Sequence, residues 1–249
     1  MKHINNIVVL TGAGISAESG IPVFRSETGL WENHRVEDVC TPEGYERDPE
    51  MVRKFYDGMR VNLKKVRPNP AHQALARLEK EWRGGYTLVT QNIDNLHEQA
   101  GSEHAIHMHG ELLKLRCYEL KGGCGELAVT TEPQDPEMAC PRCGKKVFRP
   151  HIVFFGEMPV GMDEIQKALS AADLFISIGT SGVVYPAAGF VRAARGAGAV
   201  TLEFNLEPSA VKGYFDAGVY GKAGTTLPEF VDRLLSEGDD YVSSLLSEA

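Results

Sequence analysis

The sequence contains no long apolar run and no excess of positive charge. None of its apolar stretches approaches the roughly 18 residues that a membrane-spanning helix requires. Acidic residues outnumber basic ones by 34 to 26, which gives a formal net charge of -8. We therefore expect no membrane association and no broad, non-specific binding of nucleic acid, although a local basic groove would be compatible with this charge.

The amino-terminal stretch MKHINNIVVLTGAG also lacks the features of a secretion signal. Its apolar part is only about five residues long and runs directly into glycines, whereas a signal peptide needs a longer apolar region and a small-residue cleavage site. We interpret it as a buried first strand and expect a cytoplasmic protein. The 249 residues show no repeat and no low-complexity tract, and they are enough for one large domain or one domain with a small module.

Cysteine is scarce outside one short segment that holds Cys117, Cys124, Cys140 and Cys143, while Cys40 stands alone. Without an export signal, such a cluster favours metal binding over disulfides. The CPRCG turn is typical of a zinc knuckle, and the central spacing fits a four-cysteine ribbon, although the first spacing is wider than usual. Four thiolates leave no open coordination position, so we predict one structural zinc ion. The alternative is a set of buried free thiols.

Short apolar runs that are bounded by glycine and separated by helical patterns predict an α/β fold. The candidate strands are nearly continuous in apolar residues, as expected for parallel strands covered on both faces. They span residues 7–10, 86–90, 174–178 and 200–204. Candidate helices span 49–64, 70–82, 163–172 and 228–235, the last with a proline in its first turn. We predict a doubly wound, Rossmann-like parallel sheet with its ligand at the carboxyl ends of the strands.

Two polar stretches rich in proline, glycine and charge interrupt this alternation, at about 27–67 and 112–149. We interpret both as insertions that form a smaller lobe, the second of them the zinc ribbon. The Rossmann-like lobe would then comprise about 1–26, 68–111 and 150–249, and the whole chain would be a single catalytic domain. The terminal SEGDDYVSSLLSEA is expected to be a solvated helical tail.

A glycine-rich loop, in VVLTGAGISAESGIPVFR, follows the first strand directly. Gly12 and Gly14 would let the backbone approach a pyrophosphate, whose charge the N–H groups of the next helix would meet. However, Gly20 comes later than the usual dinucleotide fingerprint allows, and the acidic residue expected about 20 residues on is missing. The pattern alone leaves nucleotide binding and simple turn glycines as alternatives, and it argues against an ordinary dehydrogenase.

Two histidines, His107 and His109, stand one residue apart in IHMHG. In an extended segment they would point to the same face, as a pair of metal ligands could. No carboxylate or third histidine at ligand spacing supports a second metal site. One of them could instead be a catalytic base.

Taken in order, GAGISAESGIPVFR, TQNIDNLHEQAG, HMHGEL, the cysteine cluster, FFGE and GTS resemble the sirtuins, over about residues 5–235. Sirtuins are NAD-dependent protein-lysine deacylases, so the resemblance implies removal of acyl groups from protein lysines with release of nicotinamide and O-acyl-ADP-ribose. The two stretches TPEGY and FYDGM further resemble the bacterial branch of the family, which includes enzymes that remove acidic acyl groups such as succinyl.

The resemblance assigns His109 as the catalytic base and leaves His107 as a packing or hydrogen-bonding neighbour. A neutral imidazole with a pKa near its ordinary value of about 6.5 suits such a proton transfer. Asn92 and Asp94 can match the donors and acceptors of the nicotinamide carboxamide, although turn formation and helix capping would also explain them. The assigned cofactor contacts are Gly12, Ala13, Gly14, Ser16, Ala17, Phe24, Arg25, Gln91, Asn92, Ile93, Asp94, Gly179, Thr180, Ser181, Asn205, Leu206, Glu207 and Ala223.

The resemblance places an acyl-lysine protein substrate between the lobes, where it would add a strand against residues 153–157. The alternative for this VFFGE stretch is a core strand that ends in a turn. Residues implied to contact the substrate are Tyr56, Met59, Val153, Phe154, Phe155 and Gly156. We expect no direct nucleic-acid binding and no membrane partner, and we expect a monomer.

The acyl-binding residues depart from the pattern of the acidic-acyl branch, in which a tyrosine and an arginine three positions later bind the distal carboxylate. Here Tyr56 is followed by Met59, and Arg60 lies about 100° further around a helix. Cys40 also replaces the small alanine expected before Thr-Pro. We predict a preference for acetyl or other neutral acyl groups and weak desuccinylation. The alternative is that Arg60 reaches in by a backbone adjustment.

Two other functions remain compatible with the motifs. Mono-ADP-ribosyl transfer would share the same glycosidic cleavage. A non-catalytic module that senses NAD or mediates zinc-dependent interactions would leave His109 and TQNID without a role.

Overall fold

The computed structural model describes residues 3–23, 30–31 and 34–248, and its largest sheet has six strands in the order β11-β10-β9-β1-β4-β5. Every neighbouring pair in this sheet is parallel. The strands are β1 Asn6–Thr11, β4 Gly85–Thr90, β5 Ala105–His107, β9 Leu174–Ile178, β10 Val200–Asn205 and β11 Ala217–Tyr220. The predicted doubly wound parallel sheet is therefore confirmed.

The chain reverses its direction of winding between β1 and β9. From β1 it adds β4 and β5 on one side, and it then returns to add β9, β10 and β11 on the other. Such a topological switch point separates the loops that follow the two central strands, and it is where doubly wound sheets bind their ligands. The loops that begin at Gly12 and Gly179 lie at this point.

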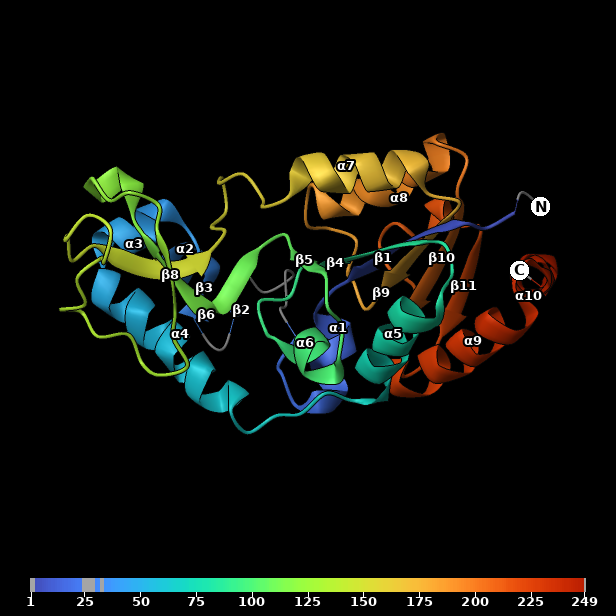
Figure 1. Ribbon diagram of the computed structural model, residues 1–249, viewed down its shortest axis with the longest axis horizontal. Coiled ribbons are helices and arrows are strands. Elements are labelled where there is room, and N and C mark those ends of the chain that lie inside the picture. The colour runs from blue at the N-terminus through green and yellow to red at the C-terminus, as the bar shows by residue number, and fades with distance from the viewer. Residues whose placement is uncertain (1–2, 24–29, 32–33, 249) are drawn as a thin grey trace.

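Helices cover both faces of the large sheet (Figure 1). On one face α5 Pro70–Glu81 and α9 Ala223–Glu237 pack together, with α10 Asp239–Glu248 beyond them. On the other face lie α7 Met162–Ala171 and α8 Phe190–Gly196. Coverage on both sides explains why the strands read as continuous apolar runs. None of the helices in the described ranges is both long and apolar enough to cross a membrane.

The helix α9 starts earlier than the sequence predicts, so that Pro228 lies inside the helix rather than in its first turn. The carboxylate of Glu18 accepts a hydrogen bond from the N–H of Gly224 at 2.8 Å, which satisfies one of the free donors at the start of the helix. This partner lies 206 residues away in the sequence, so no local pattern reveals it.

The terminal helix α10 is not a solvated tail. Tyr241 and Val242 are buried in the same core cluster as Phe230 of α9. The backbone N–H of Ile4 also donates to Asp239 at 3.1 Å, which ties the start of the chain to this helix. The predicted helix is present, but the expectation that it is solvated was wrong, because the core residues on which its apolar side chains pack lie in other elements that the local sequence does not reveal.

The second part of the molecule is built around a three-stranded antiparallel sheet in the order β7-β6-β8, at the left in Figure 1. Its strands are β6 Gly110–Cys117, β7 Leu127–Val129 and β8 Phe148–Ile152, so this sheet extends beyond residue 149, where the sequence places the end of the smaller lobe. Beside it lie α2 Val36–Val39, α3 Pro42–Arg47, α4 Pro49–Leu63 and the short pair β2 Leu30–Trp31 and β3 His34–Arg35. We call this region the small lobe.

The remaining elements are short. They are α1 Ala13–Ser16 after β1, α6 Leu96–Ala100 after β4, and four 3-10 turns at Ala17–Ser19, Glu119–Lys121, Ala187–Gly189 and Lys212–Tyr214. Because α1 has only four residues, it offers little of the helix dipole that the glycine-rich loop was expected to direct at a pyrophosphate.

Candidate functional site

The loops after β1 and β9 pack directly against each other at the switch point. The N–H groups of Gly12 and Gly14 donate to the carbonyl oxygens of Ile178 and Gly179, both at 2.9 Å. A Cβ atom added to Gly14 would lie 2.6 Å from the Cα of Gly179, and one added to Gly12 would lie 2.8 Å from the Gly179 oxygen. These glycines are therefore needed for the contact between the two loops, and their N–H groups are already occupied.

A cavity of about 540 Å³ opens from this point and extends between the large sheet and the small lobe. This volume lies within the range of about 300–1,000 Å³ that is usual for small-molecule sites. Among the residues assigned from the sequence, the cavity is lined by Gly12, Ala13, Met59, Gln91, Asn92, Ile93, Asp94, His109, Val153, Phe154, Phe155, Gly156, Gly179, Thr180 and Ser181.

Several assigned residues do not line this cavity, and two cannot be placed. Phe24 and Arg25 lie outside the described residues. Asn205 donates from its amide to the Thr180 oxygen at 2.8 Å, which links the end of β10 to the loop after β9. The assigned residues absent from the lining are Gly14, Ser16, Ala17, Tyr56, Asn205, Leu206, Glu207 and Ala223.

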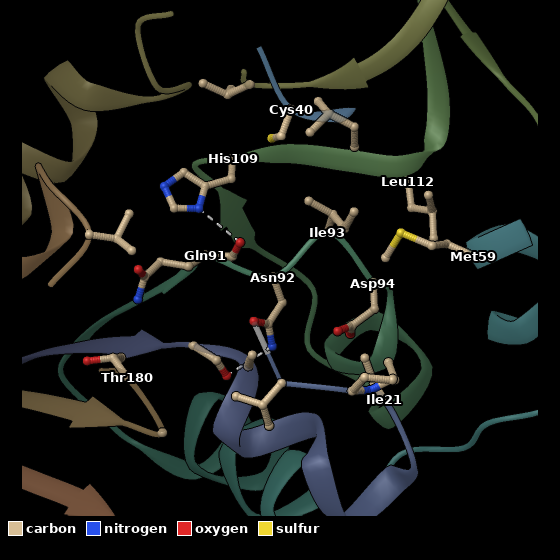
Figure 2. A pocket seen from close by; sticks show the side chains of 18 of the residues that line it. Ile21, Cys40, Met59, Gln91, Asn92, Ile93, Asp94, His109, Leu112 and Thr180 are labelled. Atoms are coloured by element: carbon tan, nitrogen blue, oxygen red, sulfur yellow. Dashed lines mark hydrogen bonds between the residues drawn. The ribbon is translucent and has the colours of Figure 1, made fainter. Parts of the chain in front are cut away.

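His109 is held in one tautomer by the backbone. Its Nδ1 lies 3.1 Å from the carbonyl oxygen of Gln91, as Figure 2 shows. Because a carbonyl oxygen can only accept, Nδ1 carries the proton and Nε2 of the neutral ring keeps its lone pair. Burial lowers the pKa of His109 below 6.5, against the opposing effect of the hydrogen bond to Gln91. The imidazole is therefore neutral near pH 7 and can accept a proton.

His107 has different partners, and its pKa shifts in the opposite direction. Its Nδ1 lies 3.0 Å from the Asn92 oxygen and its Nε2 lies 2.8 Å from the carboxylate of Glu98. Both neighbours are acceptors, so the ring donates twice only when it is charged. Burial opposes this charge, but the hydrogen bond and the charge of Glu98 outweigh it and raise the pKa of His107. His107 thus braces the backbone of Asn92 and does not line the cavity.

Asn92 is fixed by the loop after β1. Its amide nitrogen donates to the Gly12 oxygen at 3.1 Å and to the Ser16 hydroxyl at 3.2 Å. The amide oxygen is left to accept from a ligand in the cavity. In Figure 2 the Asn92 and Asp94 side chains lie along the same wall.

Asp94 is buried, and burial raises its pKa. One carboxylate oxygen accepts from the hydroxyl of Ser16 at 3.1 Å, and the other accepts from the N–H of Leu96 at 3.0 Å, where α6 begins. The turn-forming alternative for Asp94 is therefore part of the structure, and it coexists with a position in the cavity wall.

Sequence reasoning missed a buried polar layer beneath the cavity. Thr11 donates to the Thr90 hydroxyl at 2.8 Å and contacts Nε2 of His97 at 2.9 Å. The Nε2 of His72 lies 3.3 Å from the Ser16 hydroxyl, and burial lowers the pKa of His72 to about 4. This layer connects the ends of β1 and β4 to α5. The only sequence signal for it is the occurrence of polar residues at otherwise apolar strand ends and helix positions.

The four clustered cysteines form a second site in the small lobe. Their Sγ atoms all lie within 4.8 Å of one another, and the pairs Cys117–Cys143 and Cys124–Cys140 are 3.6 Å apart. A tetrahedral zinc ion with Zn–S bonds of about 2.3 Å places its sulfurs about 3.8 Å apart. The geometry fits one such ion and leaves no position for water, so the metal is structural.

The three residues considered for acyl selectivity, Tyr56, Met59 and Arg60, lie in different surroundings. Met59 lines the cavity and packs against the apolar cluster that contains Leu112 (Figure 2). Arg60 is fully buried, and its Nε donates to the Leu112 oxygen at 2.8 Å while Nη1 pairs with Asp57. The hydroxyl of Tyr56 donates to the Val39 oxygen at 3.1 Å. Neither Tyr56 nor Arg60 lines the cavity.

The stretch 153–157 lines the cavity, but it is not a strand, because β8 ends at Ile152. The N–H groups of Val153 and Phe155 donate to the oxygens of His109 and Cys40, both at 2.9 Å. These two N–H groups therefore already have partners within the protein. The chain turns at Gly156, which has a φ of 91°. The alternative of a core strand at 153–157 was therefore wrong, because the backbone partners of this apolar run are His109 and Cys40, which lie in loops.

The model of the Sir2 family matches residues 12–186. An NAD-dependent protein deacylase of Vibrio parahaemolyticus is 57% identical over 93% of this chain and 95% of its own length. A solved Sir2 homologue in complex with NAD superposes with a TM-score of 0.84 at 37% identity, over 94% of this chain and 91% of the other. A Sir2 complex with a p53 peptide and NAD gives a TM-score of 0.73 at 29% identity, over 94% and 93%. The resemblance inferred from the motifs is confirmed: the chain belongs to the Sir2 family.

Proposed function

We propose that this chain removes acyl groups from protein lysines at the expense of NAD, with His109 as the general base and with a preference for acetyl and other neutral acyl groups. The single observation that carries the role of His109 is its hydrogen bond to Gln91, which leaves a neutral Nε2 on a ring that lines the cavity. The family and the NAD-dependent deacylase relative support the reaction.

The described residues fit NAD at the switch point. Ala13 and Thr180 lie where the two central loops meet, and Asn92 and Asp94 line the cavity beside them. Asn92 offers its amide oxygen and Asp94 its carboxylate to the amide donors of a nicotinamide carboxamide. When bound, NAD supplies the ribose carbon that receives the acyl oxygen as nicotinamide leaves. The chain itself orients the ring and the ribose.

His109 then moves one proton. Nε2 takes it from a ribose hydroxyl, while Nδ1 keeps its own proton and continues to donate it to the Gln91 carbonyl oxygen, which prevents the ring from turning. The Gln91 oxygen also stabilises the charged ring that results, since it accepts from Nδ1 in both states. The stretch 153–157 also lines the cavity, where we expect its backbone to pair with a substrate peptide.

The preference for a neutral acyl group follows from the wall opposite the base. Met59 offers an apolar surface with no donor, and Leu112 and Ile93 beside it are also apolar. The guanidinium of Arg60 is fixed in the small lobe by Leu112 and Asp57. A succinyl carboxylate packed against Met59, Leu112 and Ile93 would lose its water without gaining a hydrogen-bond donor from these side chains, which costs roughly 1–3 kcal/mol or more.

A peptide assay tests the reaction itself. An acetyl-lysine peptide incubated with the protein and NAD should lose its acyl group and yield one nicotinamide and one acyl-ADP-ribose, as identified by mass spectrometry. Acyl loss without NAD would refute the mechanism. A peptide or protein that gains ADP-ribose while the acyl group stays would instead identify an ADP-ribosyl transferase.

A further inference from the structure

The stretch 153–157 forms one wall of the cavity without the support of a sheet. Beyond the two bonds to His109 and Cys40, the N–H of Glu157 donates to the Phe154 oxygen at 2.9 Å and closes a turn. The conformation of this wall therefore depends on the side chains that hold the turn from behind.

The carboxylate of Glu157 is the centre of that support. One of its oxygens, Oε2, accepts from the backbone N–H of Phe154 at 2.8 Å. Nη2 of Arg149 donates to both oxygens, at 2.7 Å and 2.9 Å. The side chains of Arg149 and Glu157 are only 2% and 23% exposed, so water competes little for this pair.

Aromatic rings fix the guanidinium as well. The Cζ atom of Arg149 lies 4.3 Å from the centre of the Phe154 ring and 4.7 Å from that of Tyr118. Both contacts are short enough for cation–π attraction. Nε and Nη1 find no hydrogen-bond acceptor among the described residues, so Glu157 is the anion on which this buried cation depends there.

We infer that Arg149 and Glu157 are positioning residues for the acyl-lysine peptide: together they hold Phe154 and the turn at 153–157 in the shape that the peptide backbone and the lysine side chain require. The inference rests on the proposed function, since it takes this wall to be the peptide site. Neither charged group contacts the Asn92 or Asp94 side chain, so NAD binding should not depend on them.

The direct test replaces Glu157 by Gln, because an amide oxygen can still accept from Phe154 but cannot form the charged pair. With an acetyl-lysine peptide and saturating NAD, E157Q should raise the peptide KM by about tenfold, as expected for one lost charge-assisted interaction. The NAD Kd should stay within about twofold of wild type and kcat within about threefold. R149M should raise the peptide KM at least as much, because it leaves the Glu157 charge unpaired.

A matched control lies on α9, where Arg233 and Glu237 form another two-bond pair at 2.8 Å and 2.9 Å, away from the cavity. E237Q should leave the peptide KM and the NAD Kd unchanged. The inference is overturned if E157Q keeps the wild-type peptide KM, or if the peptide KM and the NAD Kd of E157Q rise together. Should R149M fail to fold, E157Q alone decides, and peptide Kd by calorimetry replaces KM as the readout. Failure of the proposed function would appear differently, as absence of NAD-dependent acyl loss in the wild-type protein.

Discussion

His107 and His109 show how two identical side chains one residue apart acquire different chemistry. Each places its Nδ1 on a backbone oxygen, at 3.0 Å from Asn92 and 3.1 Å from Gln91. They differ at Nε2, where Glu98 pairs with His107 and no described residue pairs with His109. A single carboxylate thus raises the pKa of one ring, while the other ring keeps a lowered pKa and an Nε2 without a described partner.

Replacement of His109 by Tyr should therefore remove turnover. General bases contribute about 10²- to 10⁴-fold to a rate, so we expect kcat with an acetyl peptide to fall by at least about 100-fold. Zinc content and thermal stability should stay near those of wild type. His107→Asn retains one hydrogen-bonding group and should cost much less, and equal losses for the two variants would contradict the assignment.

The pH dependence of turnover should report the same ring. Burial lowers the pKa of His109 below 6.5, and the proposed mechanism requires the neutral ring. The value of kcat/KM should therefore be constant through neutral pH and fall only as the pH drops below about 6.5. A rate that falls on the alkaline side of pH 7, or an acid limb centred above pH 7, would show that another group controls the reaction.

At the scale of elements, four strands of the large sheet and the long helices could be predicted from sequence. Their buried apolar residues are either continuous or repeat with the period of a helix. The strand predicted at 174–178 coincides with β9, those at 86–90 and 200–204 are one residue short at one end, and the one at 7–10 is one residue short at both ends. Where elements depended on distant partners, local pattern failed. The start of α9 depends on Glu18, and the wall at 153–157 depends on Cys40 and His109.

The site could be predicted only in part, for the same reason. Motifs identified Asn92, Asp94 and His109, which the structure brings to one cavity. The pairing of loops through Gly12, Gly14 and Gly179, and the internal position of Tyr56, come from tertiary contacts that no single motif encodes.

The zinc ribbon is an element that cannot bury enough apolar surface to stand alone. Its core cluster contains only Leu115 and Phe148 besides two of the cysteines themselves. Bound structural zinc contributes about 10–16 kcal/mol in small zinc domains, so the ribbon should depend on the ion. We expect one zinc per chain by elemental analysis, and we expect Cys143→Ser or a strong chelator to lower the melting temperature and abolish turnover. Unchanged stability in zinc-free protein would favour free thiols.

At the scale of the whole molecule, the cavity lies between the large sheet and the small lobe. The large sheet contributes the loops after β1, β4, β5 and β9, while the small lobe contributes Met59 on α4 and the wall at 153–157 after β8. In the proposed function, the base and most cofactor contacts lie on the first side, and Met59 lies on the second. Selectivity can therefore change through the small lobe without a change in the chemistry.

Because of this separation, we expect that a substitution at Met59 can change which acyl group the protein prefers. M59R would place a guanidinium on the cavity wall, three residues after Tyr56, where it could bind a carboxylate with two hydrogen bonds. The variant should gain activity on a succinyl peptide while His109, Asn92 and the NAD Kd remain as in wild type. R60M serves as the comparison, because Arg60 is bound to Leu112 and Asp57 and should alter stability rather than acyl choice.

The most direct measurement is kcat/KM for two peptides that differ only in carrying acetyl-lysine or succinyl-lysine, each with saturating NAD. We predict that the wild-type protein favours the acetyl peptide by about tenfold or more, since one missing charge-assisted interaction is worth at least roughly 1.5 kcal/mol. M59R should narrow or invert this ratio. Comparable or faster turnover of the succinyl peptide by the wild-type protein would contradict the account.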